Sequence, residues 1–216
     1  GKRLLLILIS LALLFLIRSF IFLVLLPALF AWILSAKTKW PAGRTFAAVY
    51  LITGILFFSI GHLTGKVNPP EIITNKQTEF INLSGAATQI ELTPLQPTVK
   101  SFMSNAPQAL NHSLLRPYLW ELPVKSLLPL NIELLLCQVL LIIFIFFRRK
   151  DLSNTGRPFL FFAFFFTLTV FLIVGYIVPN LGSLVRYRSL YLPLIITPLL
   201  CMINWERMAR GIKIKK

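Results

Sequence analysis

Long apolar runs separated by short cationic turns, with one longer polar segment, make up this chain. The runs cover residues 4–36, about 46–64, 127–147, 158–178 and 189–203. A helix rises about 1.5 Å per residue, so about 20 apolar residues cross the roughly 30 Å hydrocarbon core of a bilayer. The pattern therefore predicts an all-α fold, a bundle of transmembrane helices.

The first apolar run, residues 4–36, is too long for a single span. One helix of that length would reach about 50 Å, well beyond the hydrocarbon core. The alternative is a hairpin of Leu4–Ile17 and Phe20–Ser35 that turns at Arg18, where the run is interrupted. The hairpin gives six spans in all, and the single helix gives five.

The positions of the basic residues favour six spans and indicate an orientation. With six spans, fourteen of the 22 Lys and Arg residues face the side that holds both chain ends, and eight face the other side. Cytoplasmic loops are enriched in Lys and Arg, so we expect a multi-pass membrane protein with its C-terminus in the cytoplasm. The same bias explains the net charge of +15, which therefore does not point to nucleic acid.

Four regions follow from this topology. Residues 1–64 hold the hairpin and the third span, 65–126 form an extracytoplasmic segment, 127–204 hold three more spans, and 205–216 form a basic cytoplasmic tail. Inside the extracytoplasmic segment, apolar residues recur at three- and four-residue steps, namely Val99, Phe102, Met103, Ala106, Leu110 and Leu114. This stripe predicts an amphipathic helix that rests on the membrane surface or caps the bundle.

Composition agrees with the membrane class and leaves little room for metal chemistry. The chain is 56% hydrophobic and 13% charged, whereas soluble domains carry about 25% charged residues. Cys137 and Cys201 lie inside apolar runs, which is typical of small buried side chains rather than of a disulfide or metal pair. Gly54 and Gly61 lie seven residues apart on one face of the third span, a spacing that allows close helix packing.

Glu133 is the first candidate for chemistry. It is the only acidic residue inside an apolar run, about two turns from the outer end of its span. Ionisable groups at membrane depth are costly, so they point either to a structural partner or to function. For Glu133 the structural interpretation is an ion pair with a nearby Arg, and the functional one is a proton or substrate contact in the bundle.

Arg186, Tyr187 and Arg188 are the second candidate, placed on the outer side just before the last apolar run. That run has only 15 residues, about 22 Å, so its helix must begin earlier or the membrane must thin there. On a helix, positions two apart point about 200° away from each other, so one arginine would face the bundle. In an unwound segment both would converge on one ligand. Snorkelling to lipid phosphates is the structural interpretation, and binding a phosphate or pyrophosphate is the functional one.

Two segments carry a resemblance to a known group of proteins. Residues 180–193 read N-x-G-[TS]-x-x-R-x-R-x-x-x-x-P, and residues 115–121 read LRPYLWE before a span with Glu133 near its start. Both resemble segments near the C-terminal end of bacterial multi-spanning envelope-glycan proteins. These include membrane glycosyltransferases that use polyprenyl-phosphate sugars, and polysaccharide polymerase-like proteins.

The resemblance implies an active face at the outer membrane boundary that handles an anionic lipid-linked sugar, with no further cofactor. It implies that Arg186, Tyr187 and Arg188 contact the lipid phosphate, with Arg116 as an additional contact. Glycosyltransferases of this kind place catalytic acids in an early extracytoplasmic loop, and no such acidic loop occurs in this sequence. Because the chain begins with Gly1, we expect either that the acids lie upstream, in the other half of an enzyme, or that the protein is not a complete enzyme.

Two other functions stay open at this point. A transporter or flippase-like protein would use broken spans and polar groups at membrane depth, for which Pro27, Pro193, Pro198 and Glu133 are candidates. A non-catalytic membrane subunit would instead use the polar segment 65–126 to dock a partner protein.

Overall fold

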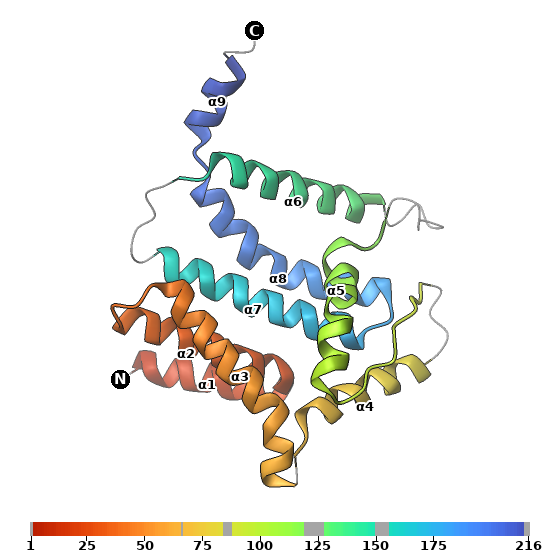
Figure 1. Cartoon of the computed structure of the whole chain (residues 1–216). Coiled ribbons are helices and arrows are strands. Elements are labelled where there is room, and N and C mark those ends of the chain that lie inside the picture. Colours follow the sequence, from red (N-terminus) through yellow and green to blue (C-terminus); the bar gives the residue numbers. More distant parts are fainter. Residues whose placement is uncertain (1, 66, 84–87, 119–127, 150–155, 214–216) are drawn as a thin grey trace.

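A computed structural model describes residues 2–65, 67–83, 88–118, 128–149 and 156–213 (Figure 1). In these ranges every named element is a helix, which confirms the predicted all-α bundle. The helices are, in chain order, α1 (Lys2–Ile17), α2 (Ser19–Lys37), α3 (Ala42–Thr64), α4 (Pro69–Asn82), α5 (Val99–Leu115), α6 (Leu128–Phe147), α7 (Gly156–Ile177), α8 (Leu181–Met202) and α9 (Trp205–Lys213).

Four of the helices are long and apolar enough to cross a bilayer: α2, α3, α7 and α8. The protein is therefore a multi-pass membrane protein. In α6 the apolar stretch Ile132–Phe147 is shorter, and α1 has 16 residues, a rise of about 24 Å. The count of six spans stays a prediction.

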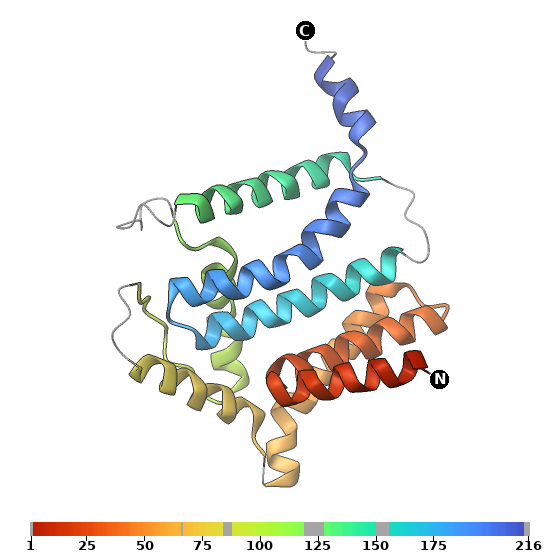
Figure 2. The ribbon, with the colours of Figure 1, turned by 180° about the vertical axis from the view of Figure 1, so that it is seen from behind.

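The first apolar run forms a hairpin of two helices rather than one continuous helix, while the crossing of the membrane by both helices stays a prediction. Helix α1 ends at Ile17, α2 begins at Ser19, and Arg18 between them has φ −143° and ψ 71°, outside the helical region. The two helices run back along each other, and the rings of Phe15 and Phe22 meet edge to face across the turn at 5.3 Å (Figures 1 and 2).

The helices run between two ends of the bundle. The α1–α2 turn, the start of α6 and the α7–α8 connection lie at one end, on the right in Figure 1, together with α4 and α5. We call this the cap end. The α2–α3 connection, the start of α7 and the ends of α6 and α8 lie at the other end, on the left in Figure 1 and on the right in Figure 2. We call it the basic end, after its exposed cations Lys37, Lys39, Arg148, Arg149 and Arg207.

Helix α7 is the centre of the packing. Its buried residues recur about every fourth position and meet small residues of α2 and an aromatic ring of α3; they include Phe162, Phe166, Val170 and Val174. In α2, Ala28 and Ala31 are fully buried, which lets the two backbones approach closely. The outward faces of α1, α3 and α6 expose large apolar side chains along their length, as expected for helices in contact with lipid.

Helix α5 caps the bundle, which is one of the two positions that its apolar stripe allowed. It crosses the end of α7 and buries Phe102, Ala109, His112 and Ser113 (Figure 1). The buried face differs from the predicted stripe, because Met103, a member of that stripe, is 63% exposed. The crossing on α7 selects the buried face of α5, and the apolar spacing of α5 alone does not determine it.

Hydrogen bonds from one side chain join the cap to α7. The buried amide of Gln77, on α4, donates to the carbonyl oxygens of Tyr176 at 2.8 Å and Thr93 at 3.2 Å, and it accepts from the backbone N–H of Leu95 at 2.7 Å. All three partners of the Gln77 amide are backbone groups that lie far from it in sequence. Gln77 therefore holds together α4, α7 and the extended segment 88–98.

Candidate functional site

The first turns of α8 lie at the cap end, and Asn180 caps the helix there. Its Oδ1 accepts hydrogen bonds from the backbone N–H groups of Gly182 at 2.8 Å and Ser183 at 3.3 Å. Such a cap satisfies N–H groups that have no partner inside the helix. The resulting 22-residue helix begins eight positions before the last apolar run, so the earlier helix start that the sequence analysis considered is confirmed.

The two arginines of α8 point in different directions. Arg186 is exposed, whereas Arg188 is only 2% exposed. The segment is helical, so the alternative in which both arginines converge on one ligand is not formed. Arg188 is the arginine that faces the bundle.

Arg188 reaches across to the end of α5. Its Nη1 donates a hydrogen bond to the backbone carbonyl oxygen of Arg116 at 2.6 Å. Its Nη2 is buried and has no hydrogen-bond partner among the residues that the structure describes. A buried guanidinium with an unused donor is costly, because the charge has lost its hydration without full compensation. This donor is the feature that marks the site.

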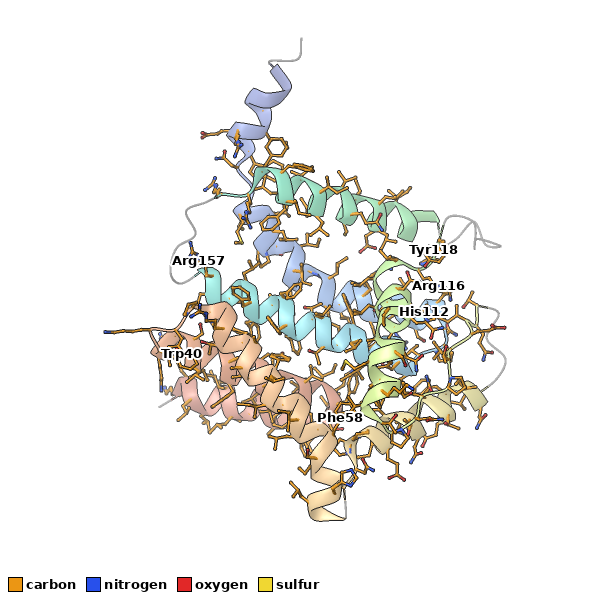
Figure 3. All side chains as sticks on the ribbon, viewed as in Figure 1. Trp40, Phe58, His112, Arg116, Tyr118 and Arg157 are labelled. Carbon is orange, nitrogen blue, oxygen red and sulfur yellow. The ribbon has the colours of Figure 1, made fainter. Side chains whose placement is uncertain are left out.

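The side chain of Arg116 belongs to the same corner of the molecule. Its guanidinium carbon lies 5.6 Å from the centre of the Tyr118 ring, and the Tyr118 hydroxyl donates to Oδ1 of Asn111 at 2.7 Å. Figure 3 shows Arg116 between His112 and Tyr118 at the end of α5. The structure thus brings together Arg116 and Arg188, two of the predicted residues. Residues 119–121 of the LRPYLWE segment lie outside the described ranges.

Tyr187 faces a different neighbour, Arg18. The guanidinium carbon of Arg18 lies 5.6 Å from the centre of the Tyr187 ring, within the range of a cation–π interaction. The ring of Phe20 packs against Tyr187 edge to face at 6.4 Å. From the sequence, Arg18 was expected only to mark the hairpin turn, and its contact with α8 was not predicted. The predicted hairpin already placed Arg18 at the same end of the bundle as Tyr187, so their proximity could have been predicted.

Glu133, on α6, is half-buried and interacts electrostatically with Arg188. No ion pair within 4 Å joins Glu133 to Arg188; between side chains that the structure describes, the close pair is Lys76 with Glu79 on α4. The direct ion pair of the structural interpretation is therefore not formed. Glu133 lowers the local positive charge without occupying the free donor of Arg188.

Other kinds of site find little support in the described residues. No group of three or more His, Cys, Asp or Glu side chains in the described ranges is placed to hold a metal ion. Helix α2 continues through Pro27, and α8 continues through Pro193 and Pro198. In these described helices the prolines therefore do not interrupt the helix.

Comparisons with protein-family models, with curated proteins and with solved structures find no match to this chain. The resemblance to envelope-glycan proteins accordingly stays a prediction. The geometry around Arg188 is what supports a function.

Proposed function

We propose that this protein acts in cell-envelope glycan synthesis and binds the phosphate of a polyprenyl-linked sugar at the outer boundary of the bacterial inner membrane. The observation that carries the proposal is the buried guanidinium of Arg188, whose Nη2 has no partner among the described residues. In this proposal a phosphate oxygen accepts from that group.

The chemistry of Arg188 favours a phosphate over a neutral ligand. A guanidinium offers five N–H donors in a planar fork that matches the oxygens of a phosphate, and it stays charged at all ordinary pH values. One donor of Arg188, Nη1, is used on the Arg116 carbonyl. The positive charge of the buried Arg188 guanidinium itself favours an anion over a neutral ligand.

A lipid tail also has a place next to this corner. On α8, Leu190 is 56% exposed, and on α6, Ile132 and Leu135 are exposed as well. Apolar helix surface that is not covered by protein lies in lipid at no cost. A polyprenyl chain in the bilayer could therefore run along α6 and α8 while its phosphate reaches Arg188.

The proposal assigns binding, and no catalytic step, to the described residues. The acidic residues that the structure describes in the cap, Glu71, Glu79 and Glu91, are exposed, and Glu79 pairs with Lys76. None of the three is buried or close to Arg188 in the manner of a catalytic acid. A transfer reaction would need an acid or base from elsewhere.

The test is binding of polyprenyl phosphate to the full chain in lipid nanodiscs, measured by native mass spectrometry. The matching polyprenol, which lacks only the phosphate, is the ligand control. We expect the wild type to prefer the phosphate by at least about tenfold, as charge-assisted hydrogen bonds are worth about 1.5–3 kcal/mol. Arg188→Met should remove this preference, and Arg188→Lys should retain only part of it because the fork is lost.

Arg186→Met is the matched control, since Arg186 is an exposed arginine two positions away on the same helix. Its binding should stay close to that of the wild type. Equal binding of phosphate and polyprenol by the wild type would overturn the proposal, and so would an undiminished preference in a folded Arg188→Met protein. Substrate flux in proteoliposomes that depends on Glu133, without phosphate binding, would instead favour a transporter.

A further inference from the structure

The junction between α8 and α9 is held rigidly at the basic end. The N–H of Arg149 donates to the carbonyl oxygen of Met202 at 2.9 Å, and the N–H of Asn204 donates to the carbonyl oxygen of Phe147 at 2.8 Å. Asn204 Oδ1 then accepts from the N–H of Arg207 at 3.0 Å and caps α9. The direction of α9 is therefore set relative to α6 and α8.

Helix α9 does not extend α8. Both views show it leaving the ends of α6 and α8 at a steep angle to these two helices (Figures 1 and 2). Because α8 is long and apolar enough to cross the bilayer, a helix at a steep angle to its end runs along the membrane surface.

The sequence of α9 is amphipathic. Trp205 and Met208 follow the i, i+3 spacing of one helix face, and the charged residues Glu206 and Arg207 lie between them in sequence. Trp205 is 42% exposed, and its Nε1 donates to the carbonyl oxygen of Leu200 at 3.2 Å, at the end of α8. Trp is enriched where apolar lipid meets water, since its ring is apolar and its N–H is polar.

Three exposed arginines gather at the same junction: Arg148 and Arg149 after α6, and Arg207 in the first turn of α9. None of them forms an ion pair within 4 Å with any side chain that the structure describes. The backbone hydrogen bonds of Arg149 and Arg207 to the α8–α9 junction hold them close in space. Such a cluster of cations at the end of membrane spans complements the phosphates of anionic lipids.

We propose that α9 is an interfacial helix that lies in the headgroup region of the leaflet at the basic end. Its Trp205 face enters the acyl boundary, and Arg148, Arg149 and Arg207 bind the phosphates of anionic phospholipids. This proposal concerns the opposite end of the bundle from Arg188 and does not depend on the proposed function.

The position of α9 is tested by quenching of Trp205 in the full chain, reconstituted with brominated phosphatidylcholines. The Trp205→Phe protein provides the background to subtract, so the other tryptophans stay in place. We expect the Trp205 signal to be quenched by bromines near the headgroups and protected from aqueous iodide. Quenching by iodide and not by brominated lipid would place α9 in water, free for a protein partner, and would overturn the proposal.

The charge component is tested with nanodiscs of phosphatidylcholine containing phosphatidylglycerol, by counting the phosphatidylglycerol molecules retained in native mass spectra. The Arg148→Gln, Arg149→Gln, Arg207→Gln triple variant should bind phosphatidylglycerol at least about tenfold more weakly than the wild type. The matched control is Lys76→Gln with Lys100→Gln, two exposed cations of the cap. Equal retention by the triple variant and the wild type would overturn this part of the proposal.

Discussion

The backbone of Gly175, in α7, lies directly against the backbone of Ala109, in α5. A methyl group on Gly175 would overlap the carbonyl oxygen of Ala109 and come within 2.6 Å of its carbonyl carbon. Both partners are main-chain atoms at the centre of the crossing, so neither can move aside as a flexible side chain would. Absence of a side chain at position 175 is what lets the cap dock on the bundle.

We predict that Gly175→Ala loosens α5 from α7. Overpacking of a tight contact costs about 1–3 kcal/mol, and the backbone clash here places the change at the upper end of that range. The measurement is thermal unfolding of the protein in detergent, which should show a lowered midpoint. Gly54→Ala is the matched control, because nothing lies within 4 Å of a methyl group at Gly54. Equal midpoints for the two variants would contradict the close contact.

We predict that Gln77→Leu frees the extended segment 88–98 from α4 and α7. The change leaves the Leu95 N–H and the carbonyl oxygen of Tyr176 without their partner, at about 1–3 kcal/mol for each buried group. Hydrogen exchange of the Leu95 amide should speed up. In Thr78→Ala, at the exposed neighbouring position, it should not change. Unchanged protection of the Leu95 amide from exchange in Gln77→Leu would show that other contacts hold the segment 88–98.

We predict that Arg188→Met raises the thermal midpoint, or leaves it unchanged, when no lipid-linked phosphate is added. A buried charge with an unused donor destabilises the empty protein, and an apolar side chain of similar length removes that cost. The same change should abolish the stabilisation that polyprenyl phosphate gives the wild type. Arg186→Met, at an exposed position, should alter neither midpoint. A strong loss of stability in Arg188→Met would indicate that Arg188 is mainly structural.

We predict the sidedness of the chain from cysteines introduced at exposed positions. In intact cells that express the protein, a membrane-impermeant thiol reagent should label Ser104→Cys, on α5, and should not label Lys39→Cys, between α2 and α3. Cys137 and Cys201 are first replaced by Ser. Lys2→Cys should stay unlabelled like Lys39→Cys, because the α1–α2 hairpin brings both positions to the same end of the bundle. Labelling of Lys2→Cys together with Ser104→Cys would contradict the six-span topology.

Several local features could be read from the sequence because their causes are local. The run 4–36 is longer than a bilayer core, and Arg18 is the polar interruption at which α1 ends and α2 begins. The last apolar run is too short to span a bilayer, which made an earlier helix start one of two alternatives. Helix α8 does begin before that run, and Asn180 caps it. The helix over residues 99–115 followed from its apolar spacing.

Packing between helices could not be read in the same way. Gly54 and Gly61 have the spacing of a close-packing face, yet Gly54 faces open space and Gly175 makes the close contact. Met103 belongs to the apolar stripe of α5 but is exposed. In each case the residue type permits the contact, and the angle at which two distant helices cross decides whether it is made.

By itself, the sequence determined the membrane class and the long apolar helices and favoured the hairpin, since burial in lipid and backbone hydrogen bonding act on consecutive residues. The polar helices α4 and α9 were not predicted. Tertiary structure alone decided that Arg188 turns inward to the Arg116 carbonyl, that Arg186 stays outside, and that Arg18 meets Tyr187. Those relationships join residues on separate helices. They depend on where neighbouring helices place their atoms, which the order of residues in one helix does not specify.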